Sequence, residues 1–215
     1  MNGHTLYVAT GNAGKLRDFA LAAAAESAGN RESWNIVPLP NLRDIAPPAE
    51  DGTTFHENAG AKALYYAQYA PGALVLADDS GLSVDALGGA PGVYSARYAD
   101  QLDFPANAGA TLDEWNNACL LAQFARVHAA APVTAQYTCV PAAARSNQLL
   151  LTAEGSVAGE ILTCPRGTGG FGYDPLFLLP GPDRTMAELD GKTRLGLSHR
   201  GAALRRLLPQ LAALL

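Results

Sequence analysis

The chain has 215 residues, a formal net charge of −5, 16% charged residues and 48% hydrophobic residues. Because disordered chains are rich in charge and poor in apolar residues, this composition argues against disorder and for a sizeable buried core. The acidic balance, with Lys and Arg in no run, argues against a nucleic-acid polymer as partner. A small anion held by a few cations and backbone amides stays open.

The sequence also argues against membrane insertion and export. No stretch approaches the ~20 apolar residues of a membrane-spanning helix. Residues 1–4 lack a basic region followed by a long apolar one, so no signal peptide is expected. The cysteines, Cys119, Cys139 and Cys164, form no CxxC pair and are odd in number, which indicates neither a disulfide framework nor a zinc site. We therefore expect a cytoplasmic protein with buried or unreactive thiols.

The first half of the chain alternates predicted strands with predicted helices. In chain order these are a strand at 5–9, a helix at 15–28, a strand at 36–39, a proline-rich loop at 38–52 and a helix at 54–69. The first helix is expected to end at Gly29-Asn30, a common stop signal. The second is expected to begin at Thr53 or Thr54, with Glu57 at capping-box spacing from Thr54.

The second half adds a predicted hairpin region. Strands are expected at 74–77, 84–87, 134–140, 149–154 and 161–162, helices at 112–127 and 201–215, and a hairpin turn at 145–147. Strand–helix alternation followed by a hairpin predicts an α/β fold, with helices on both faces of a mixed sheet. Because no linker interrupts the pattern, residues 1–215 are expected to form a single domain.

The first candidate site is the turn between the first strand and the first helix. It has the sequence Thr10-Gly11-Asn12-Ala13-Gly14-Lys15. Glycines let backbone amides approach an anion, a helix N-terminus carries partial positive charge, and a lysine neutralises phosphate. The Walker A spacing is absent. The turn is thus a candidate phosphate loop, and an ordinary strand-to-helix turn is the alternative.

The second candidate is a pair of adjacent carboxylates, Asp78 and Asp79, which follow the apolar residues 74–77 and precede Ser80. Open sheets place their ligands beyond strand ends. Carboxylates there suit Mg²⁺, which takes a few protein oxygens and shares the rest with water and substrate phosphates. Glu50 in the preceding loop could add an acid. The alternative is a surface turn, because Asp, Ser and Gly favour turns.

Two later segments are weaker candidates. Residues 167–175 are rich in glycine and include Phe171, whose ring could offer a face to a base; a flexible hairpin loop is the alternative. Ser198, His199 and Arg200 stand at the start of the last helix, where a simple cap and a solvated first turn are the alternative.

Taken in order, these segments closely resemble the non-canonical purine nucleoside triphosphate pyrophosphatases. The resemblance is carried by residues 8–15, 52–63, 77–98, 169–175, 187–189 and 198–200, and includes Ala77-Asp78-Asp79-Ser80-Gly81-Leu82 and Ser198-His199-Arg200. It covers nearly the whole chain, and residues 99–148 match least. It implies a long twisted mixed sheet flanked by helices, with two lobes and a substrate cleft between them.

The resemblance also implies the reaction and the partners. The expected activity is Mg²⁺-dependent hydrolysis of ITP, dITP and XTP to the monophosphate and pyrophosphate, which removes these nucleotides from the pool. A homodimer is expected. The competing hypotheses are a metal-dependent nucleotide-sugar transferase, which also places paired acids after a strand, and a non-catalytic protein that binds the nucleotide without turnover.

Roles carry over from the resemblance residue by residue. Asp79 would be the catalytic proton acceptor and a metal ligand, and Glu50 and Asp78 would be further acids at the metal. The implied contacts to the triphosphate are Thr10, Gly11, Asn12, Ala13, Gly14, Lys15 and Lys62. The residues implied to enclose the purine are Phe171, Gly172, Tyr173, Asp174, His199 and Arg200. Ser80 and Arg194 are implied as further substrate contacts.

Arg194 marks a departure from the family pattern. A lysine usually stands five residues before the histidine of the Ser-His-Arg motif, whereas this chain has Arg194 there and Lys192 two residues earlier. Arginine keeps the charge but replaces a compact ammonium with a planar fork. Either side chain could make the contact, and the register favours Arg194.

Overall fold

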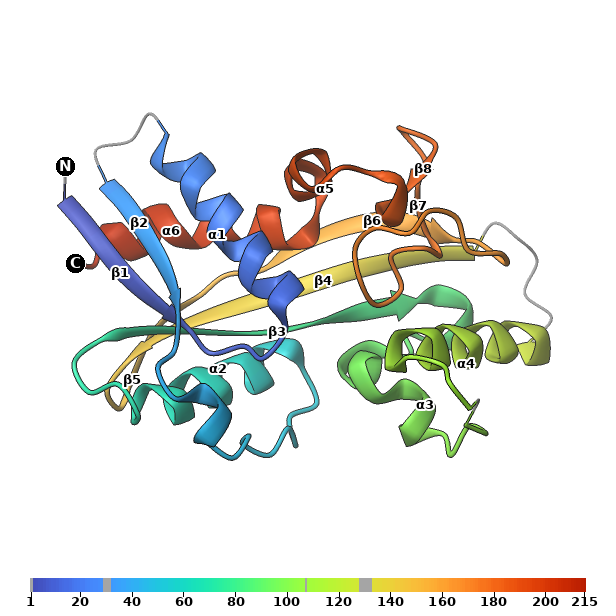
Figure 1. Cartoon of the computed structure of the whole chain (residues 1–215), viewed down its shortest axis with the longest axis horizontal. Helices are drawn as coiled ribbons and strands as arrows, with labels where there is room; N and C mark the ends of the chain where they lie inside the picture. The colour runs from blue at the N-terminus through green and yellow to red at the C-terminus, as the bar shows by residue number, and fades with distance from the viewer. Residues whose placement is uncertain (1, 29–31, 107, 128–132) are drawn as a thin grey trace. The chain divides into compact units, whose positions relative to one another are not determined.

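The computed structural model describes residues 2–28, 32–106, 108–127 and 133–215 (Figure 1). Its strands are β1 (Asn2–Val8), β2 (Glu32–Pro38), β3 (Leu74–Val84), β4 (Val133–Arg145), β5 (Gln148–Thr152), β6 (Gly155–Ile161), β7 (Phe177–Leu179) and β8 (Arg184–Thr185). Its α-helices are α1 (Ala13–Ser27), α2 (Phe55–Ala67), α3 (Tyr98–Gln101), α4 (Leu112–Val127), α5 (Gly191–Leu197) and α6 (His199–Ala212). Short 3₁₀ helices cover Leu42–Asp44, Asp85–Leu87, Gly92–Arg97 and Met186–Glu188.

The strands form one mixed sheet in the order β2-β1-β3-β4-β6-β7-β8, with β5 paired to β4. β1 pairs in parallel with both β2 and β3. The pairs β4–β5, β6–β7 and β7–β8 are antiparallel. The predicted α/β class with a mixed sheet is therefore confirmed.

The chain divides into two compact units. Unit 1 comprises Met1–Asp79, Cys139–Ser156 and Leu195–Leu215, and unit 2 comprises Ser80–Thr138 and Val157–Arg194. Each unit is described by itself below. The single domain over residues 1–215 and the cleft between two lobes stay predictions.

Unit 1 carries helices on both faces of its strands. In Figure 1, α1 and α6 lie side by side on one face and α2 lies on the other. Leu74 and Leu76 of β3 join the buried cluster that contains Phe19 of α1, whereas Val75 and Ala77 join the cluster under α2. This alternation is what the two-residue period of a strand produces. It assigns successive β3 side chains to opposite faces.

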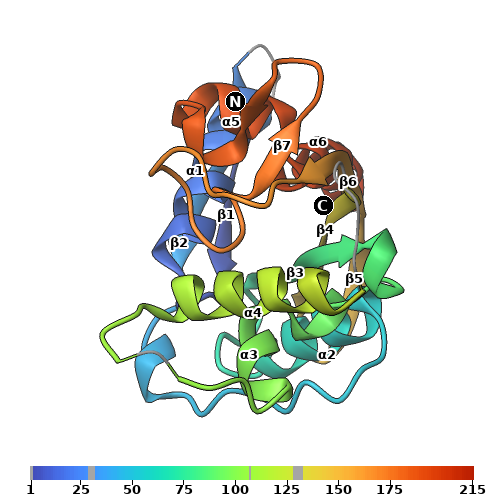
Figure 2. The same cartoon turned by 90° about the vertical axis from the view of Figure 1, so that its right-hand side faces the viewer.

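Unit 2 packs around its own buried cluster. Leu82, Leu120 and Phe177 are fully buried in it, and the rings of Tyr137 and Phe177 pack in a tilted arrangement with centroids 4.5 Å apart. Figure 2 shows α4 running beside α3, and the two helices are in contact. α4 contributes Cys119, Leu120 and Phe124 to this core.

Several predicted elements are confirmed. The helix expected at 112–127 has those bounds, and α1, α2 and β1 lie within a few residues of their predicted positions. Thr54 caps α2 in a capping box, in which Glu57 N–H donates to Thr54 Oγ1 at 3.1 Å. The expected stop of the first helix at Gly29-Asn30 lies outside the described residues. Among the described helices, none is long and apolar enough to cross a membrane.

Other expectations are wrong. The strand predicted at 84–87 is a 3₁₀ helix at Asp85–Leu87, and β3 instead continues without a break from residue 74 to residue 84. The carboxylate pair therefore lies inside a strand, not beyond its end. The short elements α3, α5, β7 and β8 went unpredicted, because they are too short for apolar residues to recur often enough to reveal a period. The expectation of buried or unreactive thiols is met by the buried Cys119 and Cys139, and for the exposed Cys164 a lack of reactivity stays a prediction.

Candidate active site

The predicted phosphate loop opens α1 in unit 1. Asn12 is the N-cap, and its Oδ1 accepts hydrogen bonds from Gly14 N–H at 2.8 Å and from Lys15 N–H at 3.1 Å. Asn12 N–H in turn donates to Thr10 Oγ1 at 3.2 Å. Gly11, Asn12 and Ala13 are exposed. The cap thus fixes the loop while the positive end of the helix faces solvent, as an anion site requires.

Strand pairing brings this loop to the carboxylate pair. Val8 of β1 pairs with Leu76 of β3, and Ala9 N–H donates to Leu76 C=O at 2.8 Å. Since the two strands run in parallel, the residues after Ala9 and the residues after Ala77 leave the pairing at the same level of the sheet. Thr10 and Asp78 therefore start from neighbouring positions.

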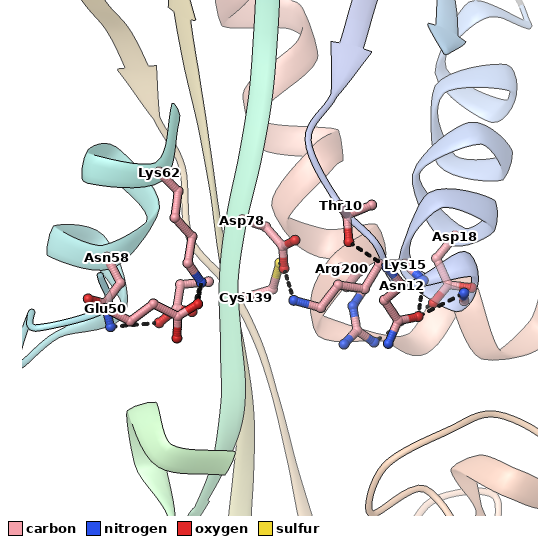
Figure 3. Close-up of polar contacts among 12 residues, drawn as sticks. Thr10, Asn12, Lys15, Asp18, Glu50, Asn58, Lys62, Asp78, Cys139 and Arg200 are labelled. Carbon is pink, nitrogen blue, oxygen red and sulfur yellow. Dashed lines mark hydrogen bonds and ion pairs between the residues drawn. The ribbon is translucent and has the colours of Figure 1, made fainter. Parts of the chain in front are cut away.

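The two carboxylates of the pair point to opposite faces of β3. Asp78 continues the alternation of Leu74 and Leu76, and Asp79 that of Val75 and Ala77. Figure 3 shows Lys62 on one side of the β3 ribbon and Asp78 with Lys15 on the other. Both aspartates are only 5% exposed, so each requires a partner for its charge.

Asp79 lies in a group with Lys62, Glu50 and Asn58. Lys62 Nζ donates to Asp79 Oδ1 at 2.8 Å and lies 2.6 Å from Glu50 Oε1. Asn58 Nδ2 donates to Asp79 Oδ2 at 3.2 Å. We call these four residues the Asp79 group. One ammonium thus bridges two carboxylates from different elements.

Burial and charge act against each other in this group. Burial raises the pKa of Asp79 above its ordinary value, and it outweighs the opposite effects of Lys62 and Asn58. Burial lowers the pKa of Lys62, but attraction to Asp79 and hydrogen bonds to Asp79 and Glu50 together leave that pKa raised. Lys62 therefore stays charged, and Asp79 is a carboxylate that takes a proton more readily than an exposed one.

Asp78 lies in a second group on the opposite face. Its Oδ2 accepts a hydrogen bond from Lys15 Nζ at 2.9 Å, and Cys139 Sγ lies 3.9 Å from the same oxygen. Burial alone would raise the pKa of Asp78, but attraction to Lys15 and Arg200 keeps it below its ordinary value. Asp78 is therefore an ionised carboxylate with cationic neighbours.

His199 and Arg200 belong to this side of unit 1 as well. Ser198 caps α6 by accepting a hydrogen bond from Gly201 N–H at 3.1 Å, as one hypothesis from the sequence predicted. The same hypothesis predicted that the first turn of α6 is exposed to solvent. This part is wrong, because His199 is 2% and Arg200 8% exposed. Arg200 Nη1 lies 3.8 Å from Asp18 Oδ2. Burial keeps the pKa of His199 well below its usual range, so its imidazole is neutral.

The glycine-rich segment of unit 2 is a loop whose backbone groups are hydrogen-bonded to side chains. Asp174 Oδ2 accepts a hydrogen bond from Phe171 N–H at 3.1 Å. A Cβ on Gly170 would lie 2.0 Å from that oxygen, so only glycine fits there. Tyr173 is buried, and its hydroxyl donates to Ser95 C=O at 2.8 Å. Phe171 stays partly exposed.

Two residues of α4 that sequence reasoning missed hold this loop. Asp113 Oδ2 accepts a hydrogen bond from Gly172 N–H at 2.7 Å, and Asn117 Nδ2 donates to Gly172 C=O at 3.1 Å. Residues four apart on a helix share a face, which lets both reach one glycine. We call this arrangement the Gly172 clamp. The sequence offered no signal for it beyond two polar residues at helical spacing.

The remaining predicted residues lie in unit 2. Arg194 is buried at 7% exposure, whereas Lys192 is exposed. A Cβ built on Gly169 would lie 3.6 Å from Arg194 Nη1, which places the guanidinium beside the glycine-rich loop. Ser80 is partly buried directly after Asp79.

Fold and site together define a class: a mixed α/β protein in which one parallel strand leads into an exposed, capped helix N-terminus, and the neighbouring strand carries a buried carboxylate paired with a lysine. The model of the Ham1 family matches residues 6–210. A dITP/XTP pyrophosphatase of Acidobacterium capsulatum is 53% identical over 207 residues, covering 96% of this chain and 98% of that protein. The dITP/XTP pyrophosphatase of Thermus thermophilus is 41% identical over 208 residues, covering 97% and 92%.

Solved structures agree with these relatives. The Ham1 protein of Staphylococcus aureus superposes with a TM-score of 0.76 at 33% identity, covering 98% of this chain and 100% of that one. A HAM1 protein from Coxiella burnetii gives a TM-score of 0.77 at 33% identity, covering 99% and 100%. The chain belongs to the Ham1 family, and the resemblance found in its sequence is confirmed.

Proposed function

We propose that this chain hydrolyses non-canonical purine nucleoside triphosphates, namely ITP, dITP and XTP, to the monophosphate and pyrophosphate. The observation that carries the proposal is that β3 carries the Asp79 group, while β1, its parallel neighbour, leads into the capped N-terminus of α1. A carboxylate with a raised pKa and an anion-accepting helix start leave neighbouring parallel strands of one unit. That pairing suits water attack on a polyphosphate, and dITP/XTP pyrophosphatases are the named relatives.

The triphosphate contacts proposed in unit 1 are the loop Thr10 to Lys15 and the ammonium of Lys62. Three phosphate groups carry charge that repels an attacking oxygen, so cations and amide dipoles must offset it. The exposed amides at the start of α1 and the Lys15 ammonium supply such charge without any rearrangement of the helix cap. Lys62 adds a second ammonium on the other face of β3.

Asp79 is the proposed proton acceptor. It would orient the water and take its proton as the oxygen attacks the α-phosphorus, and pyrophosphate would leave. A raised pKa makes a carboxylate a better base than an exposed one, provided that it is ionised at the working pH. The ammonium of Lys62, whose Nζ lies 2.8 Å from Asp79 Oδ1, stabilises the ionised form of Asp79.

The proposed cofactor is Mg²⁺, held by Asp79 and Glu50. Both carboxylates already converge on one cationic group, at 2.8 and 2.6 Å from Lys62 Nζ, so their oxygens fit a shared divalent cation. Across the described ranges, no cluster of three or more His, Cys, Asp or Glu is placed to hold a metal. Two protein carboxylates suit Mg²⁺, which keeps several waters and would screen the leaving pyrophosphate when bound.

The proposed substrate contacts of unit 2 are residues 171–174, Ser80 and Arg194, and residues 171–174 are proposed to contact the purine. From unit 1, His199 and Arg200 are proposed as further contacts. Because the Tyr173 hydroxyl donates to Ser95 C=O and the Asp174 carboxylate accepts a hydrogen bond from Phe171 N–H, we assign stacking to the partly exposed Phe171 and polar contacts to backbone groups. Hydrogen-bond donors aimed at a 6-oxo group would reject adenine, whose amino group also donates. A pocket without an acceptor for the 2-amino group would penalise guanine.

Arg194 is the proposed occupant of the family's lysine position. Its guanidinium is buried beside the glycine-rich loop, whereas Lys192 is exposed. A homodimer and a cytoplasmic location remain predictions from the sequence.

The test is a phosphate-release assay coupled to inorganic pyrophosphatase, run with ATP, GTP, ITP and XTP, with and without Mg²⁺. Release from ITP and XTP well above ATP and GTP, with IMP and pyrophosphate as products, supports the proposal. IDP and phosphate as main products would contradict attack at the α-phosphorus. Binding of ITP without turnover would favour a nucleotide sensor, and pyrophosphate release only with an added acceptor would favour a nucleotide-sugar transferase.

A further inference from the structure

Asp78 points away from the Asp79 group, whereas a residue that shared a metal ion with Asp79 would point toward it. Its side chain is 2% exposed and leaves β3 on the face of α1 and α6, opposite to Asp79. Adjacent strand residues project to opposite faces, so both carboxylates cannot turn toward one ion without breaking the strand. The metal role expected for Asp78 from the sequence therefore conflicts with its direction.

What Asp78 contacts is the lysine of the phosphate loop. Its Oδ2 lies 2.9 Å from Lys15 Nζ, and the Lys15 side chain keeps 19% of its surface exposed. Lys15 occupies the first turn of α1, with its own N–H committed to the Asn12 cap. The Asn12 cap therefore holds the backbone of Lys15, and the Asp78 carboxylate on β3 holds its ammonium group.

This anchoring has a consequence for anion binding. A lysine ammonium is a compact charge on a flexible stem, and its freedom must be lost when it binds a phosphate. A buried carboxylate that pairs with it removes much of that freedom beforehand, while the exposed part of the side chain stays open to an anion. We propose that Asp78 is a positioning residue, which holds the Lys15 ammonium at the phosphate loop and does not bind the metal.

The proposal rests on the proposed function, so its test separates the two. Wild-type hydrolysis of ITP to IMP and pyrophosphate checks the proposed function alone. A cycle of Asp78→Asn, Lys15→Ala and the double variant then checks the coupling, through the KM for ITP, kcat, the Mg²⁺ concentration that gives half-maximal rate, and calorimetric binding of pyrophosphate. Asp100→Asn, an exposed aspartate of α3, is the matched control.

We expect Asp78→Asn to raise KM and weaken pyrophosphate binding about tenfold or more, with a smaller change in kcat and no change in half-maximal Mg²⁺. In the Lys15→Ala background, Asp78→Asn should cost nothing further. A shift in half-maximal Mg²⁺ like that of Asp79→Asn would overturn the proposal, and so would losses that multiply in the double variant. A loss of stability with an unchanged KM would also overturn it, because it would show a merely structural role.

Asp78→Glu keeps the experiment decisive if Asp78→Asn does not fold. It retains the charge, so the buried pair survives, but its extra methylene moves the ammonium. We expect a raised KM with unchanged half-maximal Mg²⁺, whereas a wild-type KM would overturn the positioning role. Pyrophosphate binding reads the same coupling without turnover, so an inactive wild type would sink the proposed function and leave this test in force.

Discussion

The two compact units build their candidate sites from different groups. In unit 1 the site consists of buried, charged side chains that pair across β3: Asp78 with Lys15, and Asp79 with Lys62. In unit 2 it consists mainly of backbone groups, held by the Gly172 clamp and by glycines with positive φ at residues 170 and 172. One site depends on charge and the other on loop geometry.

This difference predicts how each unit responds to substitution. Removing one partner of a buried ion pair leaves an uncompensated charge, which costs about 3–5 kcal/mol. Removing one hydrogen bond to a loop costs about 0.5–1.5 kcal/mol. Substitutions in unit 1 should therefore have the larger effects, on phosphate binding at Asp78 and on the chemical step at Asp79, whereas those in unit 2 should mostly change affinity for the base.

The largest effect is expected for Asp79→Asn. The amide keeps the shape but removes the proton acceptor, and loss of a general base typically costs about 10²–10⁴ in rate. Single-turnover hydrolysis of ITP should fall by that factor, while ITP binding by calorimetry should fall far less. Asp100→Asn should behave like wild type. Turnover near wild type in Asp79→Asn would remove Asp79 from its assigned role.

The pH dependence tests the same residue without a substitution. A general base must be deprotonated, and burial raises the pKa of Asp79 above its ordinary value. As pH falls through that raised pKa, kcat/KM should drop about tenfold per pH unit, on a limb that lies above the ordinary pKa of an aspartate. A rate that stays level down to the ordinary pKa of aspartate would show that Asp79 does not limit the reaction.

Arg194 brings a buried charge into unit 2, and so sharpens the contrast between the units. Arg194→Ala should raise the KM for ITP by a factor that corresponds to about 1.5–3 kcal/mol of lost binding free energy, which is the contribution of a hydrogen bond to a charged group. Arg194→Lys should retain much of the activity, and the exposed Lys192 should tolerate alanine. Steady-state kinetics decides it: damage in Lys192→Ala with a silent Arg194→Ala would mean that Lys192 is the ligand.

Phe171→Ala should weaken ITP binding by about 1–3 kcal/mol, because this is the free energy that stacking of a base on an aromatic ring contributes. The single-turnover rate at saturating ITP should change less, since the ring takes no part in proton transfer. An unchanged KM would instead make Phe171 a residue of the loop's own packing.

The sequence predicted those parts of the fold that have local causes. The α2 capping box needs only Thr54 and Glu57 three residues apart, and α4 begins at a similar pair in which Thr111 Oγ1 accepts from Glu114 N–H at 3.2 Å. The turn that leads from β1 into α1 was also predictable, because a strand, two glycines, a lysine and a helix follow one another directly in the chain.

The direction of the carboxylate pair was not predictable in this way. Asp-Asp-Ser-Gly has the local composition of a turn, yet β3 runs through it, and Lys15 and Lys62 meet the two charges from opposite faces. These lysines lie 63 and 17 residues away along the chain. No local pattern records such pairing, so the sequence indicated the residues of the site but not which of them act together.

The smallest effect should come from the Gly172 clamp, and α4 supplies its own control. Asn117 donates to Gly172 C=O at 3.1 Å, whereas its neighbour Asn116 accepts from Ala99 N–H at 2.9 Å and donates to Ala96 C=O, away from the loop. Asn117→Ala removes one hydrogen bond to the loop, about 0.5–1.5 kcal/mol, so the KM for ITP should rise severalfold with little change in kcat.

Asn116→Ala removes two hydrogen bonds from a more deeply buried side chain and should lower the melting temperature more than Asn117→Ala does, with KM unchanged. Thermal melts and steady-state kinetics on both variants separate loop geometry from general stability. If KM follows the melting temperature in both variants, the clamp matters only for folding. If KM moves in Asn117→Ala alone, the order of the Gly172 loop sets affinity for the nucleotide, and unit 2 acts through geometry where unit 1 acts through charge.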